Sequence, residues 1–269
     1  MMITYTSADF DMQRTAGYTL LATVAQDECA LAIVDQARRL KALQTYDSAL
    51  VPQAVENLLG RSFQHVKVSV FDSRYMFVPT EVFDDTYQQV YRRYLPDEGL
   101  VNFEVSTIAS LGVNMLYQAN RLDLAPFTAR FPLLQAYPFI QVLLCSTAAF
   151  GTGADNPVVV LDITSSRMAI CLFDQGKFIY GNDFETYSTA DFTYYLLSVL
   201  EHVDWVNKKP HIYLSGDIAL GDERHGLLSE YGWTTAFLDS GSLTGVAVPE
   251  ELMQLKHRFL TLFGLVVCG

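Results

Sequence analysis

The chain has 269 residues, about half of them apolar, with 30 acidic against 18 basic side chains and a formal net charge of −12. This length can bury a large core without disulfides or a structural metal, and the apolar content excludes a disordered chain. The acidic balance disfavours a nucleic-acid or anionic-membrane ligand, because both require a local excess of Lys and Arg. No apolar run reaches the roughly 20 residues that span a bilayer, and the first residues lack a secretory pattern. We therefore expect a cytoplasmic protein without membrane insertion.

In chain order, the first predicted elements form a weak repeat. The segment that starts at Tyr18 aligns without a gap with the segment that starts at Pro157, over roughly thirty residues. Each copy predicts three short strands joined by tight turns, followed by a helix and a further strand. In the first copy the helix opens after Pro52 and closes at Gly60, and the next strand covers 66–71. The repeat predicts a duplication.

The first lobe contains additional elements before the second copy begins. We expect a helix over 84–94, strands at 101–105 and 113–117, and a helical stretch with prolines over 125–149. The Gly-rich link 151–157 is the clearest break in composition. It places a boundary between two lobes, residues 1–152 and residues 153–269.

The strands and helices of the second copy are easier to predict than those of the first. Its predicted strands are 158–163, 168–173, 178–183 and 211–215. Ser188 and Asp191 have the spacing of a capping box and predict the start of the intervening helix. A helix over 223–231, a strand at 234–238 and a final helix over 249–263 follow, with 239–245 as a connection. Three strands, a helix and a strand, repeated, predict an α/β protein of duplicated βββαβ lobes.

Three stretches of the second lobe are informative in addition to the order of elements: Leu161-Asp162-Ile163-Thr164-Ser165-Ser166, Asn182-Asp183-Phe184 before the helix at 191–197, and Tyr213-Leu214-Ser215-Gly216-Asp217. Together with that order, they resemble the ribonuclease H-like fold of actin, sugar kinases and heat-shock chaperones, the actin-like ATPase fold. More narrowly, the chain is similar to an uncharacterised bacterial family of unknown function with that fold. The resemblance covers the second lobe well and the first mainly by the arrangement of elements.

The resemblance implies a nucleotide cleft, and this chain departs from the family's pattern there. In active members an Asp-x-Gly turn begins each lobe, so that backbone N–H groups reach the phosphates and the carboxylates hold Mg²⁺. Thr23 stands where the first carboxylate belongs, and the following turn, which includes Asp27, has no glycine. The second turn keeps Asp162 but has Thr164 and Ser165 in place of glycines, and the third motif keeps only Gly216, followed by Asp217.

Three possible functions follow from this comparison. We expect a non-catalytic binding or assembly module, a pseudoenzyme without a resident cofactor, acting on a protein partner whose identity the sequence does not give. Its vestigial cleft would consist of five positions: Asp162, Thr164, Ser165, Gly216 and Asp217. The alternatives are an active ATPase or small-molecule kinase that binds Mg²⁺-ATP, and a cytoplasmic adaptor of a membrane secretion or pilus-type complex.

Other motifs give weaker predictions. A nuclease of this strand order would use carboxylates such as Asp162, Asp217 and Asp72, but the negative net charge of the chain argues against a nucleic-acid substrate. The histidines lack the paired spacing of metal ligands, so no metal site is expected. The cysteines form no Cys-x-x-Cys pair, which predicts buried thiols and no zinc or redox motif; they are Cys29, Cys145, Cys171 and Cys268.

Overall fold

The computed structural model describes residues 2–25, 28–71, 74–95, 103–118, 121–151 and 157–268. The chain divides into two compact units, one of residues 1–145 with 268–269 and one of residues 146–267. We call these unit 1 and unit 2 and describe each by itself. Among the described residues, every helix is too short or too polar to cross a bilayer.

Unit 1 contains a six-stranded sheet with the order β1-β4-β3-β2-β5-β9. The strands β2 and β3 form an antiparallel hairpin, whereas β5 and β9 continue the sheet parallel to β2. The bounds are β1 Thr4–Thr6, β2 Thr19–Val24, β3 Glu28–Val34, β4 Leu40–Asp47, β5 His65–Val70 and β9 Gln135–Pro138.

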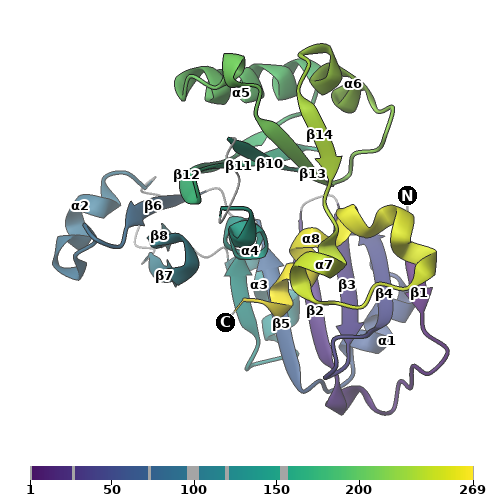
Figure 1. Cartoon of the computed structure of the whole chain (residues 1–269). Coiled ribbons are helices and arrows are strands. Elements are labelled where there is room, and N and C mark those ends of the chain that lie inside the picture. The colour runs from purple at the N-terminus through teal and green to yellow at the C-terminus, as the bar shows by residue number, and fades with distance from the viewer. Residues whose placement is uncertain are drawn as a thin grey trace. The chain divides into compact units, whose positions relative to one another are not determined.

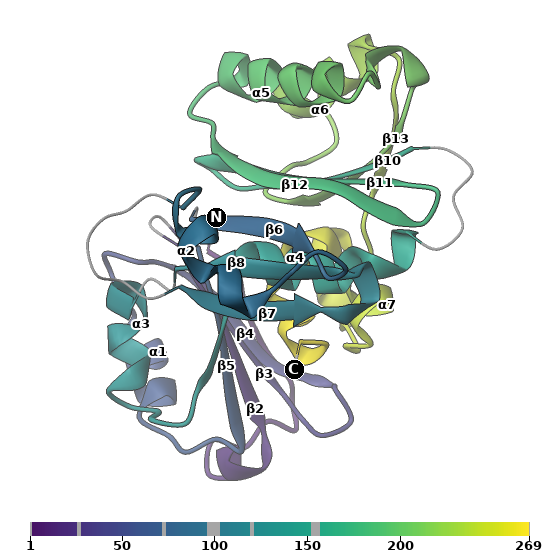
Figure 2. The same cartoon turned by 90° about the vertical axis from the view of Figure 1, so that its left-hand side faces the viewer.

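Two helices cover one face of this sheet, α1 (Gln53–Leu59) and α3 (Arg121–Thr128), as Figure 2 shows. Apolar side chains that alternate along the strands, such as Leu20 and Val68, pack against Val55 of α1 and Phe127 of α3. The expected helix after Pro52 is present and is capped by Gly60.

A smaller antiparallel sheet in unit 1 has the order β6-β8-β7. Its strands are β6 (Tyr75–Pro79), β8 (Val113–Tyr117) and β7 (Glu104–Ile108), and α2 (Gln88–Arg92) accompanies it. Tyr91 of α2 packs against Val78 and Leu116 of this sheet. The next helix of the chain, α4, covers Phe139–Thr147.

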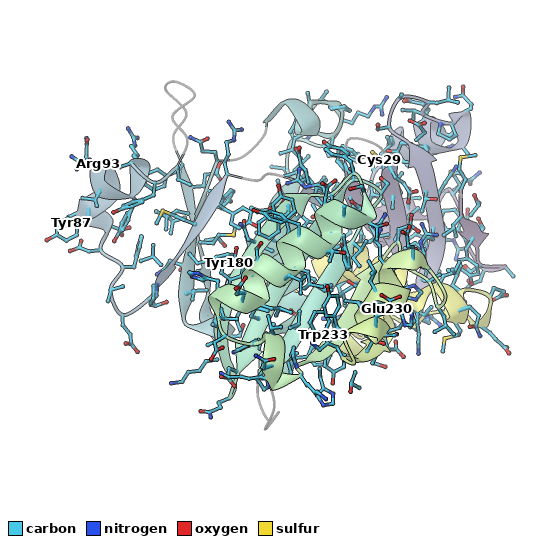
Figure 3. All side chains as sticks on the ribbon, turned by 90° about the horizontal axis from the view of Figure 1, so that it is seen from above. Cys29, Tyr87, Arg93, Tyr180, Glu230 and Trp233 are labelled. Carbon is cyan, nitrogen blue, oxygen red and sulfur yellow. The ribbon has the colours of Figure 1, made fainter. Side chains whose placement is uncertain are left out.

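Unit 2 contains a five-stranded sheet with the order β12-β11-β10-β13-β14. Its strands are β10 Val158–Ile163, β11 Arg167–Asp174, β12 Lys177–Glu185, β13 His211–Gly216 and β14 Thr234–Phe237. Figure 1 shows α5 (Thr189–His202) and α6 (Glu223–Glu230) over one face of it. Phe192 and Leu196 of α5 pack there against Val159 and Leu161 of β10. Trp233, labelled in Figure 3, joins this core just after α6.

The duplication is visible in the strand pairing. Thr19 pairs with Val34 in the first hairpin, and the equivalent pair in the second hairpin is Val158 with Phe173. Both units also carry an irregularity at the same point of the next strand pair, between Ile33 and Val34 and between Leu172 and Phe173. The shared order and register confirm the prediction of an α/β protein with duplicated βββαβ units.

Several predicted elements differ from the structure. The stretch 125–149 is not a continuous helix, because β9 interrupts it and satisfies its backbone groups by pairing with β5. The strand predicted at 101–105 lies at Glu104–Ile108, and residues 101–102 fall outside the described ranges. The strands β1 and β6 were not predicted. Residues 152–156 of the predicted link also lie outside the described ranges.

The last third of the chain contains two further differences. The predicted helix over 249–263 is a 3-10 segment, Glu250–Phe259, followed by the short helix α8, Leu260–Phe263. The connection 239–245 contains a one-turn helix, α7 (Ser240–Thr244), because the Asp239 side chain accepts a hydrogen bond from the N–H of Ser242. The capping box of Ser188 and Asp191 at the start of α5 is confirmed.

Candidate functional site

Asp162, the carboxylate that the sequence singles out, is buried inside the sheet of unit 2. It lies on β10 directly opposite Ser215 of the parallel strand β13, and the Ser215 hydroxyl donates a hydrogen bond to Asp162 Oδ2. Only 3 % of Asp162 and none of Ser215 is exposed. Burial raises the pKa of Asp162 to about 7, while the hydrogen bond from Ser215 opposes that shift.

This environment differs from that of a metal-binding carboxylate. A carboxylate that holds Mg²⁺ must be charged and must present its oxygens to the ion and its waters. The carboxyl group of Asp162 is instead engaged by a neighbouring strand. Because side chains alternate along a strand, Asp162 lies on the face opposite Leu161 and Ile163, which pack toward α5 and α6.

Thr164 and Ser165 form the turn that follows β10. The Thr164 N–H donates to the Arg167 carbonyl at 2.9 Å, and the Arg167 N–H donates to the Thr164 hydroxyl at 3.1 Å. Arg224 of α6 donates to the Thr164 carbonyl at 3.1 Å. The Thr164 hydroxyl therefore closes the turn, whereas Ser165 lies exposed at its tip.

Gly216 ends β13, and the backbone of the neighbouring strand β10 leaves no room for a side chain at this position. Its φ is +84°, and a Cβ there would lie 2.0 Å from the carbonyl oxygen of Ile163. The next residue, Asp217, donates its N–H to that same carbonyl. Its carboxylate forms an ion pair of 2.9 Å with Arg258, which lies on the 3-10 segment. A close contact within the sheet is sufficient to require glycine at this position.

The five predicted positions thus lie together at the carboxyl ends of β10 and β13. The structure adds three partners for which sequence reasoning assigned no role, namely Ser215, Arg224 and Arg258. Ser215 is part of the quoted motif and could have been singled out from it. The two arginines come from elements far along the chain, so no local pattern connects them to the motif.

The equivalent point in unit 1 has a different chemistry. Thr23 of β2 lies opposite Ser69 of β5 in the same register as Asp162 and Ser215. The Ser69 hydroxyl is buried and meets no hydrogen-bond partner among the described residues. Asp27 and Asp72, the other carboxylates considered for this lobe and for a nuclease, lie outside the described ranges.

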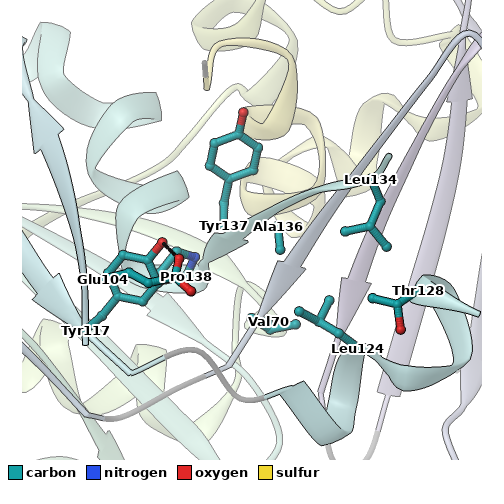
Figure 4. A pocket seen from close by; sticks show the side chains of 9 residues that line it. All are labelled: Val70, Glu104, Tyr117, Leu124, Thr128, Leu134, Ala136, Tyr137 and Pro138. Atoms are coloured by element: carbon teal, nitrogen blue, oxygen red, sulfur yellow. Dashed lines mark hydrogen bonds between the residues drawn. The ribbon is translucent and has the colours of Figure 1, made fainter. Parts of the chain in front are cut away.

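Unit 1 also contains a pocket of about 340 Å³ at the carboxyl ends of β5 and β9 (Figure 4). Val70, Leu124 and Pro138 are among its apolar walls. Its polar end consists of Glu104 and Tyr117, whose hydroxyl donates to the Glu104 carboxylate at 3.0 Å. Burial raises the pKa of Tyr117, so this hydroxyl remains a neutral donor. Within the described ranges, no group of three or more potential metal ligands gathers around one point.

Comparison with solved structures shows the fold. A Bacteroides thetaiotaomicron VPI-5482 protein of actin-like ATPase fold and unknown function aligns with a TM-score of 0.73 and 14 % identity, over 97 % of this chain and 99 % of that one. A structure of the PilM-PilN type IV pilus biogenesis complex aligns with a TM-score of 0.66 and 14 % identity, over 93 % and 97 %. The chain therefore has the actin-like ATPase fold.

The sequence comparison identifies the family. Residues 7–232 match the profile of DUF3822, described as a protein of unknown function, and the chain belongs to this family. No curated protein matches the sequence.

Proposed function

We propose that this protein is a non-catalytic binding or assembly module in which the nucleotide cleft of the actin-like fold has degenerated. The engagement of Asp162 by Ser215 carries this proposal, because it commits the one retained carboxylate to the interior of a sheet. The lobes would correspond to residues 1–152 and 153–269.

The magnitude of the losses supports a pseudoenzyme. Removing a carboxylate that holds the metal, or a donor to the transferred phosphate, costs roughly 3 kcal/mol of transition-state stabilisation, about a hundredfold to a thousandfold in rate. Thr23 stands in the place of one such carboxylate. The hydroxyl of Thr164 closes a turn, and Gly216 accommodates the backbone of Ile163. Several such losses together leave little turnover.

Calorimetric titration with Mg²⁺-ATP, combined with a phosphate-release assay, tests the proposal. We expect neither micromolar binding nor phosphate release from the wild-type protein. Asp162→Asn should change the melting temperature and leave both nucleotide assays at background. Micromolar binding together with phosphate release that Asp162→Asn abolishes would establish an active ATPase or kinase and overturn the proposal.

A second candidate function is that of a cytoplasmic adaptor for a membrane secretion or pilus-type complex. The observation that favours it is the fold similarity to PilM, which in that structure is in complex with PilN. Co-sedimentation of the native protein with the membrane fraction of its own cells tests this role. Sedimentation that a salt wash or removal of a membrane partner abolishes would support it, whereas a monomer that stays in the supernatant would contradict it.

A further inference from the structure

A second cavity in unit 1 lies where β5 and β9 begin, at the opposite end of these strands from the pocket that contains Glu104. Its volume is about 400 Å³. Its walls are the connection from α1 to β5 and the connection from α3 to β9, over residues 61–66 and 130–135. The parallel pairing of β5 with β9 brings these two connections to the same edge of the sheet. The cavity takes no part in the nucleotide cleft, so its ligand is independent of the function proposed above.

Two arginines line this cavity, and only one of them has a carboxylate partner. Arg130 forms an ion pair of 2.6 Å with Glu56 of α1. Arg61 is exposed, and no carboxylate in the described part of the chain pairs with its guanidinium. With His65 of the cavity wall counted as neutral, two guanidinium groups and one carboxylate leave a single net positive charge here. This reverses the charge of the chain as a whole, which is −12.

The same two connections give the cavity an apolar part. The rings of Phe63 and Phe131 lie edge to face, with their centres 6.1 Å apart. Phe131 belongs to the buried core of unit 1, and Phe63 and Leu134 pack against that core. Leu133 also lines the cavity and is 94 % exposed. A ligand with an apolar body would therefore cover surface that is now in contact with water.

We propose that this cavity binds a small organic acid, a monocarboxylate with an aromatic or branched aliphatic body. The volume lies within the range of small-molecule pockets. A guanidinium keeps its charge and presents a planar pair of donors that matches a carboxylate, so Arg61 is the primary contact for the acid group. Ser62, Gln64 and Gln135 line the cavity and supply neutral hydrogen-bonding groups.

The charge of the cavity selects among anions. One net positive charge balances one carboxylate. The second negative charge of a phosphate ester would have no counter-charge and would meet the repulsion of Glu56. We therefore expect monocarboxylates to bind more tightly than phosphate esters of the same body.

Titration of the wild-type full-length chain with three matched probes, followed by amide NMR shifts, tests this proposal without any substitution. The probes are 3-phenylpropionate, its neutral amide and 3-phenylpropylamine, which share one aromatic body and differ in charge. We expect the acid to bind with a dissociation constant of about 1 mM or below. The amide should bind at least about tenfold more weakly, and the amine more weakly still.

The same titration can overturn the proposal in three ways. The shifts that the acid causes should fall on residues 61–66 and 130–135. Shifts confined to other residues would assign the probe to another site. Equal affinity for the three probes would show that charge does not govern binding. The absence of binding by the acid in the millimolar range would likewise overturn the proposal.

Arg61→Gln should weaken the binding of 3-phenylpropionate by about 10- to 100-fold, because it removes a charge-assisted pair. Arg93→Gln is the matched control. It removes the same charge from an exposed arginine of unit 1 that does not line the cavity. Its affinity should stay within about twofold of the wild type, because salt screens an exposed charge outside the site. Unchanged binding in Arg61→Gln, or equal losses in the two variants, would contradict the proposal.

Glu56→Gln should change the affinity in the opposite direction. It releases the Arg130 guanidinium from its ion pair and raises the net charge of the cavity by one. We expect 3-phenylpropionate to bind several-fold more tightly, and phenyl phosphate, a dianion, to gain more than the monoanion does. The lost ion pair is partly exposed, so the fold should persist, which the melting temperature checks. A folded variant that binds the acid no more tightly than the wild type would contradict the proposal.

Discussion

The two units contain the same parallel strand pair, β2 with β5 in unit 1 and β10 with β13 in unit 2, but differ in the side chains near its carboxyl end. In unit 2 the buried carboxyl of Asp162 accepts a hydrogen bond from Ser215. In unit 1 Thr23 occupies the equivalent position opposite Ser69, whose hydroxyl is buried without a hydrogen-bond partner in the described part of the chain. The comparison teaches that strand pairing and apolar faces preserve the scaffold while its polar positions diverge. Four experiments test this difference, from the largest expected effect to the smallest.

The largest effect concerns the pH dependence of stability that Asp162 gives to unit 2. Burial raises the pKa of the folded carboxyl to about 7, whereas the ordinary value is 3.8. Between these values the folded state binds more protons than the unfolded chain, so the free energy of unfolding falls as the pH rises. The loss is on the order of 4 kcal/mol in total and is complete above about pH 7.

Urea unfolding of the wild type and Asp162→Asn at about pH 5 and about pH 7.5 measures this effect. The wild type should lose stability relative to the variant at the higher pH, because asparagine does not titrate. Identical pH profiles for the two proteins would show that Asp162 ionises as easily in the folded state as in the unfolded chain.

Gly216→Ala should be the next most disruptive change. A Cβ at this residue meets the Ile163 backbone at a positive φ, so we expect a loss of at least about 3 kcal/mol in the free energy of unfolding. Val70 stands at the equivalent point of unit 1, which shows that the strand pair itself does not require glycine there.

Gly221→Ala is the matched control for this substitution. Gly221 has a similar φ of +86° and no atom within 4 Å of the added carbon. It should lose only about 1–2 kcal/mol, the cost of the left-handed conformation alone. Equal losses in the two variants would remove the contact with Ile163 as the cause.

Ser215→Ala should have an intermediate effect. It removes the hydrogen bond to a buried carboxyl, which costs about 1–3 kcal/mol. It should also move the pH-dependent loss of stability to higher pH, since the hydrogen bond from Ser215 lowers the pKa of Asp162. Denaturant unfolding as a function of pH measures both effects. An unchanged pH profile would mean that the hydroxyl does not act on the carboxyl.

Ser69→Ala should be the least destabilising change. The hydroxyl that it removes is buried and has no partner among the described residues, so its loss should leave the free energy of unfolding unchanged or raise it by up to about 1–2 kcal/mol. The same denaturant assay measures it. A loss as large as that of Ser215→Ala would show that the two serines play equivalent parts and would break the comparison between the units.

Much of the fold could be predicted because its signals are local. The first strands of unit 2 follow from short apolar runs such as that over 158–163, and the start of α5 follows from Ser188 and Asp191. Apolar spacing predicts an α-helix where the final 3-10 segment lies, because it does not distinguish the two hydrogen-bond patterns. The strand β9 could not be predicted from local patterns, because its partner β5 lies more than sixty residues earlier in the chain.

The candidate site was predictable in position and not in role. The sequence pointed to Asp162 and Gly216 through their motifs, and the register of β10 and β13 brings them together. Their roles depend on contacts that no motif contains. Ser215 engages the carboxyl, and the Ile163 backbone occupies the space beside Gly216.

The sequence by itself determined the class of fold, the duplication and the loss of the first carboxylate, because residue type and periodicity act over short distances along the chain. Only the tertiary structure decided that Asp162 is buried against Ser215 and that Gly216 is required by a neighbouring strand. Burial and contact between distant residues arise when strands and helices pack, and the spacing of residues along the chain does not record them.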